Sequence, residues 1–240
     1  MPVAAASLAR SLKALVFDVF GTCTDWRGSV IRAGQAARSG ADWSVIADQW
    51  RREGYIDAIR RIRSGEIPYA SSDVLFRRKL DELNVQHRLG LSEEEAAELA
   101  RAWRRLDPWP DTVEGLARLK EKFVISPLSN GTFATLTSMA KSAGMPWDCI
   151  ISTELRNTFK PEREAYLLAP TLLDVRPEEV MLVAAHSSDL RGALAAGLHT
   201  ALVRRPLEWG PDGSPPEPAD PDFDLVTTDF LDLHRQLSVA

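Results

Sequence analysis

The sequence predicts an α/β protein: a Rossmann-like parallel sheet core with a helical cap domain inserted after the first strand. Short apolar runs alternate with helical patterns along most of the 240 residues, and such alternation is typical of parallel strands joined by right-handed crossovers. Residues 27–106 differ, because they contain no convincing strand run and are rich in Arg, Glu, Ala and Trp. We therefore expect a core domain from residues 1–26 and 107–240, and a cap domain from residues 27–106.

The first strand is predicted at residues 12–20, where the apolar run Ala14–Phe17 leads directly into Asp18. Gly21 and Thr22 then break the run, so Asp18 lies at the carboxyl end of this strand. Similar apolar runs predict later strands at residues 123–126, 149–152, 180–185, 200–203 and 223–226. In a parallel sheet, ligands gather beyond the carboxyl ends of the strands, so we expect the functional site at that edge.

The insertion is predicted to be helical throughout and to form a lid over this edge. A long helix is expected at residues 42–63, and the capping box that begins at Ser92 starts another that continues toward residue 105. The Pro-rich stretch 107–111 marks the return to the core. We expect an ordered loop at residues 205–221, which are rich in Pro and Gly, and a short last helix at residues 230–237.

Composition restricts the class of function. The net charge is −5, so no broad basic surface indicates nucleic-acid binding. No apolar run is long enough to span a membrane, and the N-terminus lacks the features of a secretory signal. The two cysteines, Cys23 and Cys149, fit no metal-ligand spacing and are compatible with a reducing compartment. We expect a cytoplasmic protein that binds neither nucleic acid nor membrane.

Four groups of polar residues each follow a predicted strand. Asp18 follows the first, Ser129 and Asn130 the second, Lys160 the third, and Asp189 the fourth. Taken singly, each has an ordinary structural explanation: a turn aspartate, a helix cap, a solvent-facing lysine and another helix cap. Their joint order, however, brings all of them to one edge of the sheet. A carboxylate there can act as a covalent nucleophile.

On these residues the sequence resembles the haloacid dehalogenase superfamily, and within it the type II L-2-haloacid dehalogenases. The resemblance runs from Lys13 to about Leu237. It is carried by Asp18-Val19-Phe20-Gly21-Thr22, Ser129-Asn130-Gly131, Lys160-Pro161 through Tyr166, and Asp189, with support from Trp50-Arg51. It implies a hydrolase that converts a small 2-haloacid anion into a 2-hydroxyacid through an ester on Asp18, with inversion and without a cofactor.

The resemblance also implies a role for each site residue. Ser129, the loop near Thr22 and Lys160 would hold the substrate carboxylate. Arg51 and Asn130 would bind the departing halide, Lys160 and Asp189 would position the hydrolytic water, and Tyr166 would take a polar role near Lys160. For Arg51 and Tyr166 the alternatives are a solvated arginine face and simple packing on the sheet. A homodimer is compatible with the resemblance, because dimerisation is typical of such proteins.

Phe20 distinguishes this chain from the Mg²⁺-dependent phosphatases, which make up most of the superfamily that it resembles. In those enzymes the first motif has the pattern Asp-x-Asp, and its second Asp protonates a leaving alkoxide. Phe20 can neither protonate nor ligate, whereas a halide leaves without a proton. The last motif offers only Asp189 where paired acids would hold Mg²⁺, so we expect no metal. Phe20 is expected to exclude water around Asp18.

His186 is the main departure from the usual pattern, in which Ser-Ser-Asn precedes the final Asp region. This chain has Ala184-Ala185-His186 instead, and a titratable imidazole replaces an amide. A neutral structural histidine is the commonest role, and a halide-binding residue is the alternative. In this segment the chain resembles the branch of haloacid dehalogenases that acts on fluoroacetate. An Mg²⁺-dependent phosphatase and a non-catalytic binding protein remain as alternative functions for the chain.

Overall fold

The structure is a computed structural model that describes residues 8–211, 213 and 220–238. It contains a six-stranded sheet in the order β5-β4-β1-β6-β7-β8, in which every neighbouring pair is parallel. The strands are β1 (Ala14–Phe17), β4 (Val124–Ser129), β5 (Ile151–Ser152), β6 (Val180–Ala184), β7 (His199–Val203) and β8 (Leu225–Thr227). The predicted parallel α/β fold is confirmed, and β1 is shorter than the predicted span 12–20.

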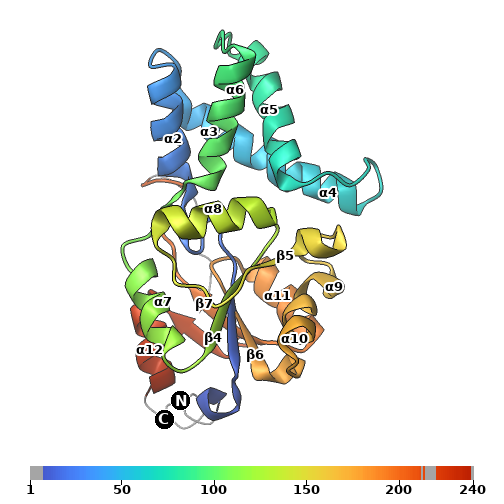
Figure 1. The fold of residues 1–240 in the computed structure, drawn as a ribbon, viewed down its shortest axis with the longest axis vertical. Helices are drawn as coiled ribbons and strands as arrows, with labels where there is room; N and C mark the ends of the chain where they lie inside the picture. Colours follow the sequence, from blue (N-terminus) through green and yellow to red (C-terminus); the bar gives the residue numbers. More distant parts are fainter. Residues whose placement is uncertain (1–7, 212, 214–219, 239–240) are drawn as a thin grey trace.

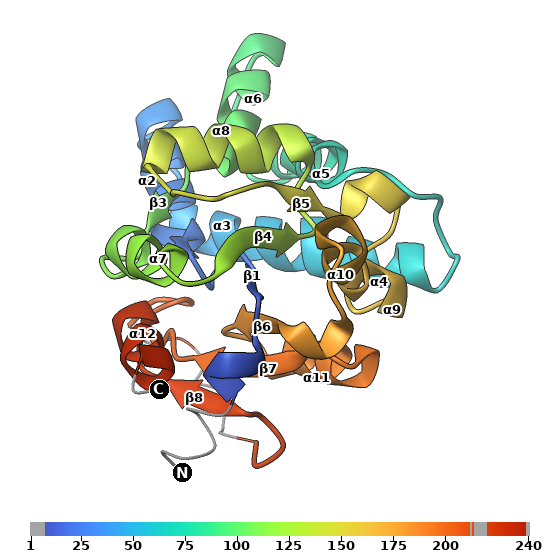
Figure 2. The ribbon, with the colours of Figure 1, turned by 60° about the horizontal axis from the view of Figure 1, so that its bottom comes forward.

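Both faces of the sheet are covered by helices (Figures 1 and 2). Leu15 and Phe17 of β1 belong to the hydrophobic cluster on one face, whereas Ala14 and Val16 belong to the cluster on the other face. This division follows from the strand geometry, because successive side chains point to opposite faces. The covering helices are α7 (Thr112–Lys120), α8 (Phe133–Ala143), α9 (Arg163–Tyr166), α10 (Leu168–Leu173), α11 (Ser187–Ala196) and α12 (Phe230–Ser238), with 3-10 turns η3 (Thr153–Arg156) and η4 (Pro177–Glu179).

The inserted helices stand at one end of this layer, as Figure 1 shows. They are α2 (Trp26–Ala37), α3 (Trp43–Arg51), η1 (Arg52–Asp57), α4 (Ala58–Arg63), α5 (Ser72–Gln86), α6 (Glu93–Ala100) and η2 (Arg101–Arg104). The helix predicted at residues 42–63 is therefore interrupted, because η1 is a π-helical segment between α3 and α4. The predicted capping box is present, since the Ser92 hydroxyl accepts from the Glu95 N–H and the Glu95 carboxylate accepts from the Ser92 N–H.

A two-stranded antiparallel sheet, which the sequence analysis did not predict, joins the points where the chain leaves and re-enters the sheet layer. It consists of β2 (Thr24–Asp25) and β3 (Asp107–Pro108). The insertion also contacts the layer through Asp73, whose carboxylate accepts hydrogen bonds from the hydroxyls of Thr132 and Thr135. The boundary between core and cap near residues 26 and 107 remains our proposal.

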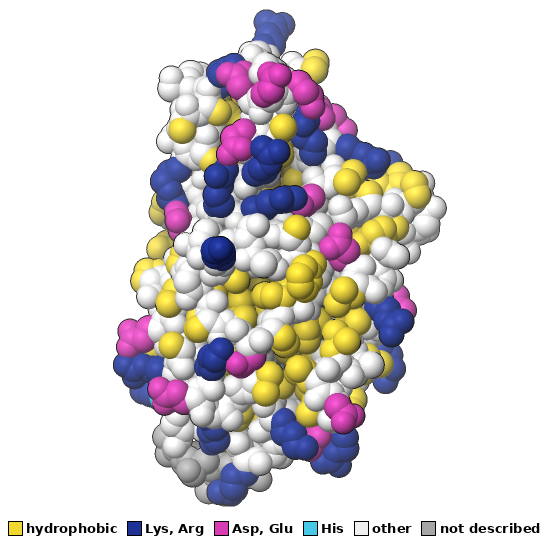
Figure 3. Space-filling model, in the orientation of Figure 1, with side chains coloured by type: hydrophobic (Ala, Val, Ile, Leu, Met, Phe, Trp, Pro, Cys, Tyr) yellow, Lys and Arg dark blue, Asp and Glu magenta, His cyan; other side chains and the backbone are white. Residues whose placement is uncertain are grey.

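On the face seen in Figure 3, Lys and Arg side chains lie among Asp and Glu side chains over the insertion, and apolar side chains gather below it. The insertion contains ion pairs between such side chains, for example Arg77 with Asp81 and Glu93. None of the helices in the described ranges is long and apolar enough to cross a membrane. Of the loop predicted at residues 205–221, residues 212 and 214–219 lie outside the described part.

Candidate active site

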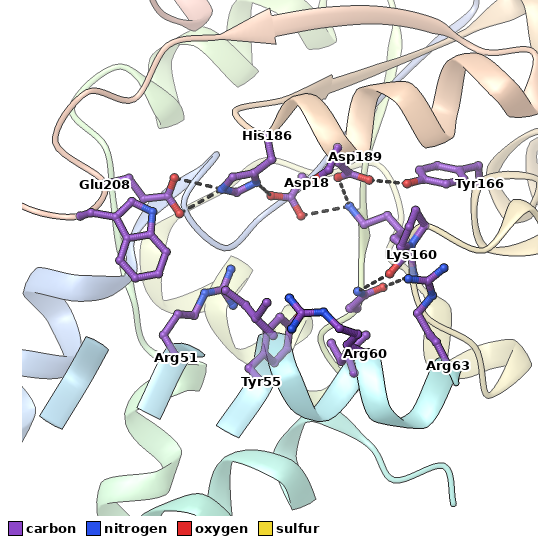
Figure 4. Close-up of a pocket in the computed structure, with 16 residues that line it drawn as sticks. Asp18, Arg51, Tyr55, Arg60, Arg63, Lys160, Tyr166, His186, Asp189 and Glu208 are labelled. Atoms are coloured by element: carbon purple, nitrogen blue, oxygen red, sulfur yellow. Dashed lines mark hydrogen bonds and ion pairs between the residues drawn. The ribbon is translucent and has the colours of Figure 1, made fainter. Parts of the chain in front are cut away.

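A cavity of about 360 Å³ lies between the carboxyl ends of the strands and the inserted helices. Figure 4 shows the side chains around it. Those from the sheet layer are Asp18, Asn130, Lys160, Pro161, Tyr166, His186, Ser188, Asp189, Glu208 and Trp209, and those from the insertion are Arg51, Tyr55, Ile56, Ile59, Arg60 and Arg63. The convergence expected for parallel strand ends is therefore observed, and one wall of the cavity comes from the insertion.

Asp18 lies just beyond β1 and is 8% exposed. Its Oδ1 accepts from Nζ of Lys160 at 3.0 Å, and its Oδ2 accepts from the hydroxyl of Thr22 at 2.8 Å. Nδ1 of His186 lies 3.5 Å from the same Oδ2. Burial alone raises the pKa of Asp18, but the positive charge of Lys160 and the contacts with His186 outweigh it and hold that pKa well below its usual range. Asp18 is therefore a buried but ionised carboxylate.

Thr22 ties this carboxylate to the neighbouring strand. Its hydroxyl donates to Asp18 and accepts a hydrogen bond from the backbone N–H of Ala185 at 2.9 Å. Thr22 is completely buried, so it lies behind the carboxylate and orients it. Its hydroxyl hydrogen is committed to Asp18 rather than directed at a substrate.

Lys160 bridges the two aspartates that the sequence analysis singled out. Its Nζ donates to Oδ2 of Asp189 at 2.5 Å as well as to Asp18, and the hydroxyl of Tyr166 donates to Oδ1 of Asp189 at 2.8 Å. Burial alone lowers the pKa of Lys160, but the two carboxylates outweigh this and raise it. Tyr166 can approach because position 192 is glycine: a Cβ there would lie 2.4 Å from the Tyr166 hydroxyl. Lys160, Asp189 and Tyr166 therefore form one network.

Asn130 lines the cavity, as expected, whereas Ser129 is not among the residues that line it. The Asn130 Oδ1 accepts from the backbone N–H of Lys160 at 2.8 Å and from the Thr153 hydroxyl at 3.2 Å, so this amide holds the lysine segment in place. Ser129 is completely buried, and its hydroxyl accepts from the N–H of Gly131. In this arrangement Ser129 does not reach the cavity to hold a substrate carboxylate, because its hydroxyl caps the turn beneath.

Arg51 enters the cavity from the end of α3 and is 6% exposed. Its guanidinium carbon lies 4.5 Å from the ring centroid of Tyr55 and 5.4 Å from that of Phe20. Within the described part of the chain, Nε and Nη1 have no hydrogen-bond partner. Buried N–H donors of a charged group are costly when unpaired, and an anion in the cavity would satisfy them. Phe20 itself is buried among aromatic rings of the insertion, such as Phe76 and Trp103.

Glu208 is a site residue that the sequence analysis missed. It follows β7 and is 5% exposed; both carboxylate oxygens lie 3.0 Å from Nε2 of His186, and Oε1 accepts from Nε1 of Trp26 at 3.1 Å. Its position in the sequence could have indicated it, because Glu208 comes five residues after the strand predicted at residues 200–203, and the other site residues were also predicted from their position after a strand. It went unnoticed because it lies in a Pro- and Gly-rich loop that carries no motif.

The insertion contributes further lining residues that periodicity alone did not reveal. Tyr55, Ile59, Arg60 and Arg63 all line the cavity, and only the first of these four lies in the π-helical segment. Within the described residues, no group of three or more His, Cys, Asp or Glu side chains is arranged to hold a metal ion.

Comparison with known proteins identifies the family. Residues 12–197 match the model of the haloacid dehalogenase-like hydrolases. The (S)-2-haloacid dehalogenase of Xanthobacter autotrophicus is 32% identical over 81% of this chain and 76% of the relative. A solved L-2-haloacid dehalogenase from that organism carries covalently bound chloropropionic acid; it is 29% identical with a TM-score of 0.79, over 95% of this chain and 98% of the other.

Two further solved structures are more similar. The L-2-haloacid dehalogenase PA0810 is 43% identical with a TM-score of 0.89, over 94% of this chain and 99% of the other. The defluorinating L-2-haloacid dehalogenase Rha0230 is 39% identical with a TM-score of 0.90, over 95% of both chains. With the motif order and the strand-end geometry, these matches show that the chain belongs to the haloacid dehalogenase-like hydrolases and, among them, to the L-2-haloacid dehalogenases.

Proposed function

We propose that this protein hydrolyses the carbon–halogen bond of small 2-haloacids and releases the 2-hydroxyacid through an ester on Asp18. The observation that carries the proposal is that one cavity is lined by an ionised, buried nucleophile and by a buried cation with two N–H-bearing nitrogens that have no hydrogen-bond partner among the described residues. Asp18 supplies the first and Arg51 the second. The covalent chloropropionic acid in the Xanthobacter relative supports the same course of reaction.

In the first step, a lone pair of the Asp18 carboxylate forms a bond to C2 of the substrate while the carbon–halogen bond breaks on the opposite side. The halide leaves with the bonding electrons and needs no proton. Because Asp18 is shielded from solvent, it reacts without first shedding a full hydration shell. The unpaired N–H groups of Arg51 then receive the halide. The substrate carboxylate lies within the field of Lys160.

In the second step, water attacks Cγ of the Asp18 ester. The bond between Cγ and the oxygen on C2 breaks, which regenerates the carboxylate and releases the 2-hydroxyacid with one oxygen that came from Asp18. Lys160 holds the carboxyl group of Asp18 in place during this step, and Asp189 holds Lys160. The new oxygen of the carboxylate comes from water.

The substrates that we propose are chloro-, bromo- and fluoroacetate and 2-chloropropionate. The cavity of about 360 Å³ has room for each of these acids, and the likeness to a defluorinating relative supports fluoroacetate. We also propose that the protein works in the cytoplasm as a homodimer, for which light scattering of the purified protein is the test of assembly.

A halide-release panel over these four acids, run in the presence of a chelator, tests the proposal. We expect release with at least one of them, and none from D18N, whereas D81N on the exposed face of α5 serves as the matched control. In H₂¹⁸O, a single turnover should place the label in the Asp18 carboxylate and leave the product hydroxyl unlabelled. Label in the hydroxyl during the first turnover would refute the ester pathway.

A further inference from the structure

His186 lies between two carboxylates that come from different parts of the chain. On one side Nε2 faces both oxygens of Glu208 at 3.0 Å, and on the other Nδ1 faces Oδ2 of Asp18 at 3.5 Å. The imidazole lines the cavity and is partly exposed to it. Figure 4 shows the three side chains in a row, Glu208 to His186 to Asp18.

The outer carboxylate is built into the fold. Glu208 also accepts from Nε1 of Trp26, and a Cβ at position 21 would lie 2.1 Å from Glu208 Oε1, so Gly21 makes room for it. Burial alone raises the pKa of Glu208, but the charge of His186 outweighs it and lowers that pKa. An ionised carboxylate on Nε2 fixes the imidazole tautomer, because it needs a proton on that nitrogen. In neutral His186, the lone pair is then on Nδ1, beside the nucleophile.

We propose that His186, oriented by Glu208, is the general base that activates water for hydrolysis of the Asp18 ester. The inference rests on the proposed function and assigns its second step. In this arrangement the imidazole touches the reacting water, and Glu208 is a positioning residue that acts through it. A base oriented by a buried carboxylate is a recurrent arrangement in hydrolytic chemistry.

The charge state of the site supports this sequence of events. The charged groups next to the imidazole are Asp18 and Glu208. Further around the same cavity lie Lys160, Asp189, Arg51, Arg60 and Arg63. Burial alone lowers the pKa of His186, but Glu208 and Asp18 outweigh it and raise the pKa well above its usual range, so the ring is protonated before reaction. Ester formation removes the negative charge of Asp18. The pKa of His186 then falls, and the ring can release its proton to solvent.

The proton balance of the second step is complete with this base. Neutral His186 takes a proton from water at Nδ1 as the hydroxyl oxygen bonds to Cγ of Asp18. The tetrahedral intermediate expels the alkoxide of the 2-hydroxyacid, which takes that proton from the imidazolium. The new Asp18 carboxyl group then gives its own proton to His186, which restores the ion pair. One proton and one halide are released per turnover.

The other polar groups near Asp18 are less suited to this task. Lys160 is held as an ammonium by two carboxylates, which leaves it no lone pair. Asp189 accepts from Lys160 and from Tyr166, and the ammonium group of Lys160 lies between it and Asp18. Among the residues that the structure describes, only His186 combines a nitrogen beside Asp18 with a carboxylate that fixes its tautomer.

Rapid-quench kinetics with 2-chloropropionate separate the two steps. For H186N and E208Q we expect a burst of about one halide per site, followed by ester hydrolysis slowed ~100-fold or more, within the range for general bases. Intact-protein mass spectrometry should show the ester accumulating, located on the Asp18 peptide. H199N is the matched control, since His199 also pairs with an aspartate, Asp224, but lies outside the cavity.

The pH profile of ester hydrolysis provides a readout that a purely structural role would not change. Wild-type hydrolysis should decline toward acid pH as His186 in the ester form becomes protonated. Because the charge of Glu208 raises the pKa of His186, E208Q should move this decline to lower pH. H186N should abolish it.

The outcomes distinguish the two proposals. No halide from the wild type with any haloacid would overturn the proposed function and this inference together. A second outcome is that the wild type releases halide normally, whereas H186N shows slower halide release but hydrolyses the ester at the wild-type rate. That outcome would overturn the inference alone and assign His186 to halide binding. Unchanged ester hydrolysis and an unchanged pH profile in E208Q would remove Glu208 from the scheme.

Discussion

The ammonium group of Lys160 lies 3.0 Å from Oδ1 of Asp18, and both side chains are almost completely buried. A buried charge without its partner is much less stable than the pair. The nucleophile therefore depends on Lys160 for its ionised state, and the same contact contributes to folding and to catalysis.

Replacing Lys160 by methionine should affect both properties. We expect K160M to lower halide release at least ~100-fold, because Asp18 becomes protonated, and to lower the free energy of unfolding by about 3–5 kcal/mol. K160R should restore the charge without restoring activity, since a planar guanidinium does not replace a compact ammonium. Halide assays and urea denaturation measure the two effects, and wild-type release by K160M would contradict the assignment.

Removing the guanidinium of Arg51 should separate activity from stability. We expect R51M to lose halide release while its free energy of unfolding without halide equals or exceeds that of the wild type, because two unpaired N–H groups are no longer buried. Bromide should raise the melting temperature of the wild type by binding the folded state, and should not do so for R51M.

Arg52 provides the control for that experiment. It is the next residue along, is exposed, and lies over the ring of Trp209 instead of in the cavity. R52M should keep both the activity and the response to bromide. Equal stabilisation of R51M and R52M by bromide would argue against a halide site at Arg51.

The hydroxyl group of Thr22 should matter more for stability and activity than the shape of its side chain. T22V keeps the volume but leaves the buried N–H of Ala185 without its acceptor, which we expect to cost about 1–3 kcal/mol of unfolding free energy. Halide release should also fall, because Asp18 loses a donor that orients it. T22S keeps the hydroxyl, so its activity should stay closer to the wild type. Denaturation curves and initial rates of both variants test this.

The ionisation of His186 should make part of the stability depend on pH. Its pKa in the folded state is raised, so the extra stability is fully present below its unfolded pKa of about 6.5 and is lost as pH rises through the folded value. The difference in unfolding free energy between wild type and H186N should therefore shrink with rising pH, by at most about 1.4 kcal/mol per pH unit. Denaturant titrations from pH 5.5 to 9 measure it, and a growing difference would contradict the assignment.

The sequence was sufficient to place the residues that follow strands. Asp18, Lys160 and Asp189 could be brought together without coordinates, because parallel strands end at one edge and each residue followed its own apolar run. The network among them was not readable in the same way. That Asn130 would hold the Lys160 segment, and that Ser129 would turn inward to cap Gly131, depends on turn geometry that a pattern of residue types does not specify.

Glu208 and the insertion show where the pattern failed. Glu208 lies in a loop whose path across Gly21 is decided by packing of its carboxylate on Trp26 and His186, which are distant in sequence. The helix at residues 42–63 was predicted with one regular period. A single period cannot reveal which residues beyond Arg51 face the cavity, because the backbone changes its pitch in between.

The π-helical segment at residues 52–57 determines how the residues of α4, which follows it, are rotated about the helix axis. An α-helix turns about 100° per residue, and a π turn takes an extra residue to complete; six such residues therefore delay the helix by roughly one position. Without that delay, Ile59, Arg60 and Arg63 would be rotated by about 100° about the helix axis relative to Arg51. Shortening the segment by one residue would thus change which residues of α4 face the cavity, while Arg51 would keep its place. The length of this segment is therefore a means of changing substrate size independently of the chemistry.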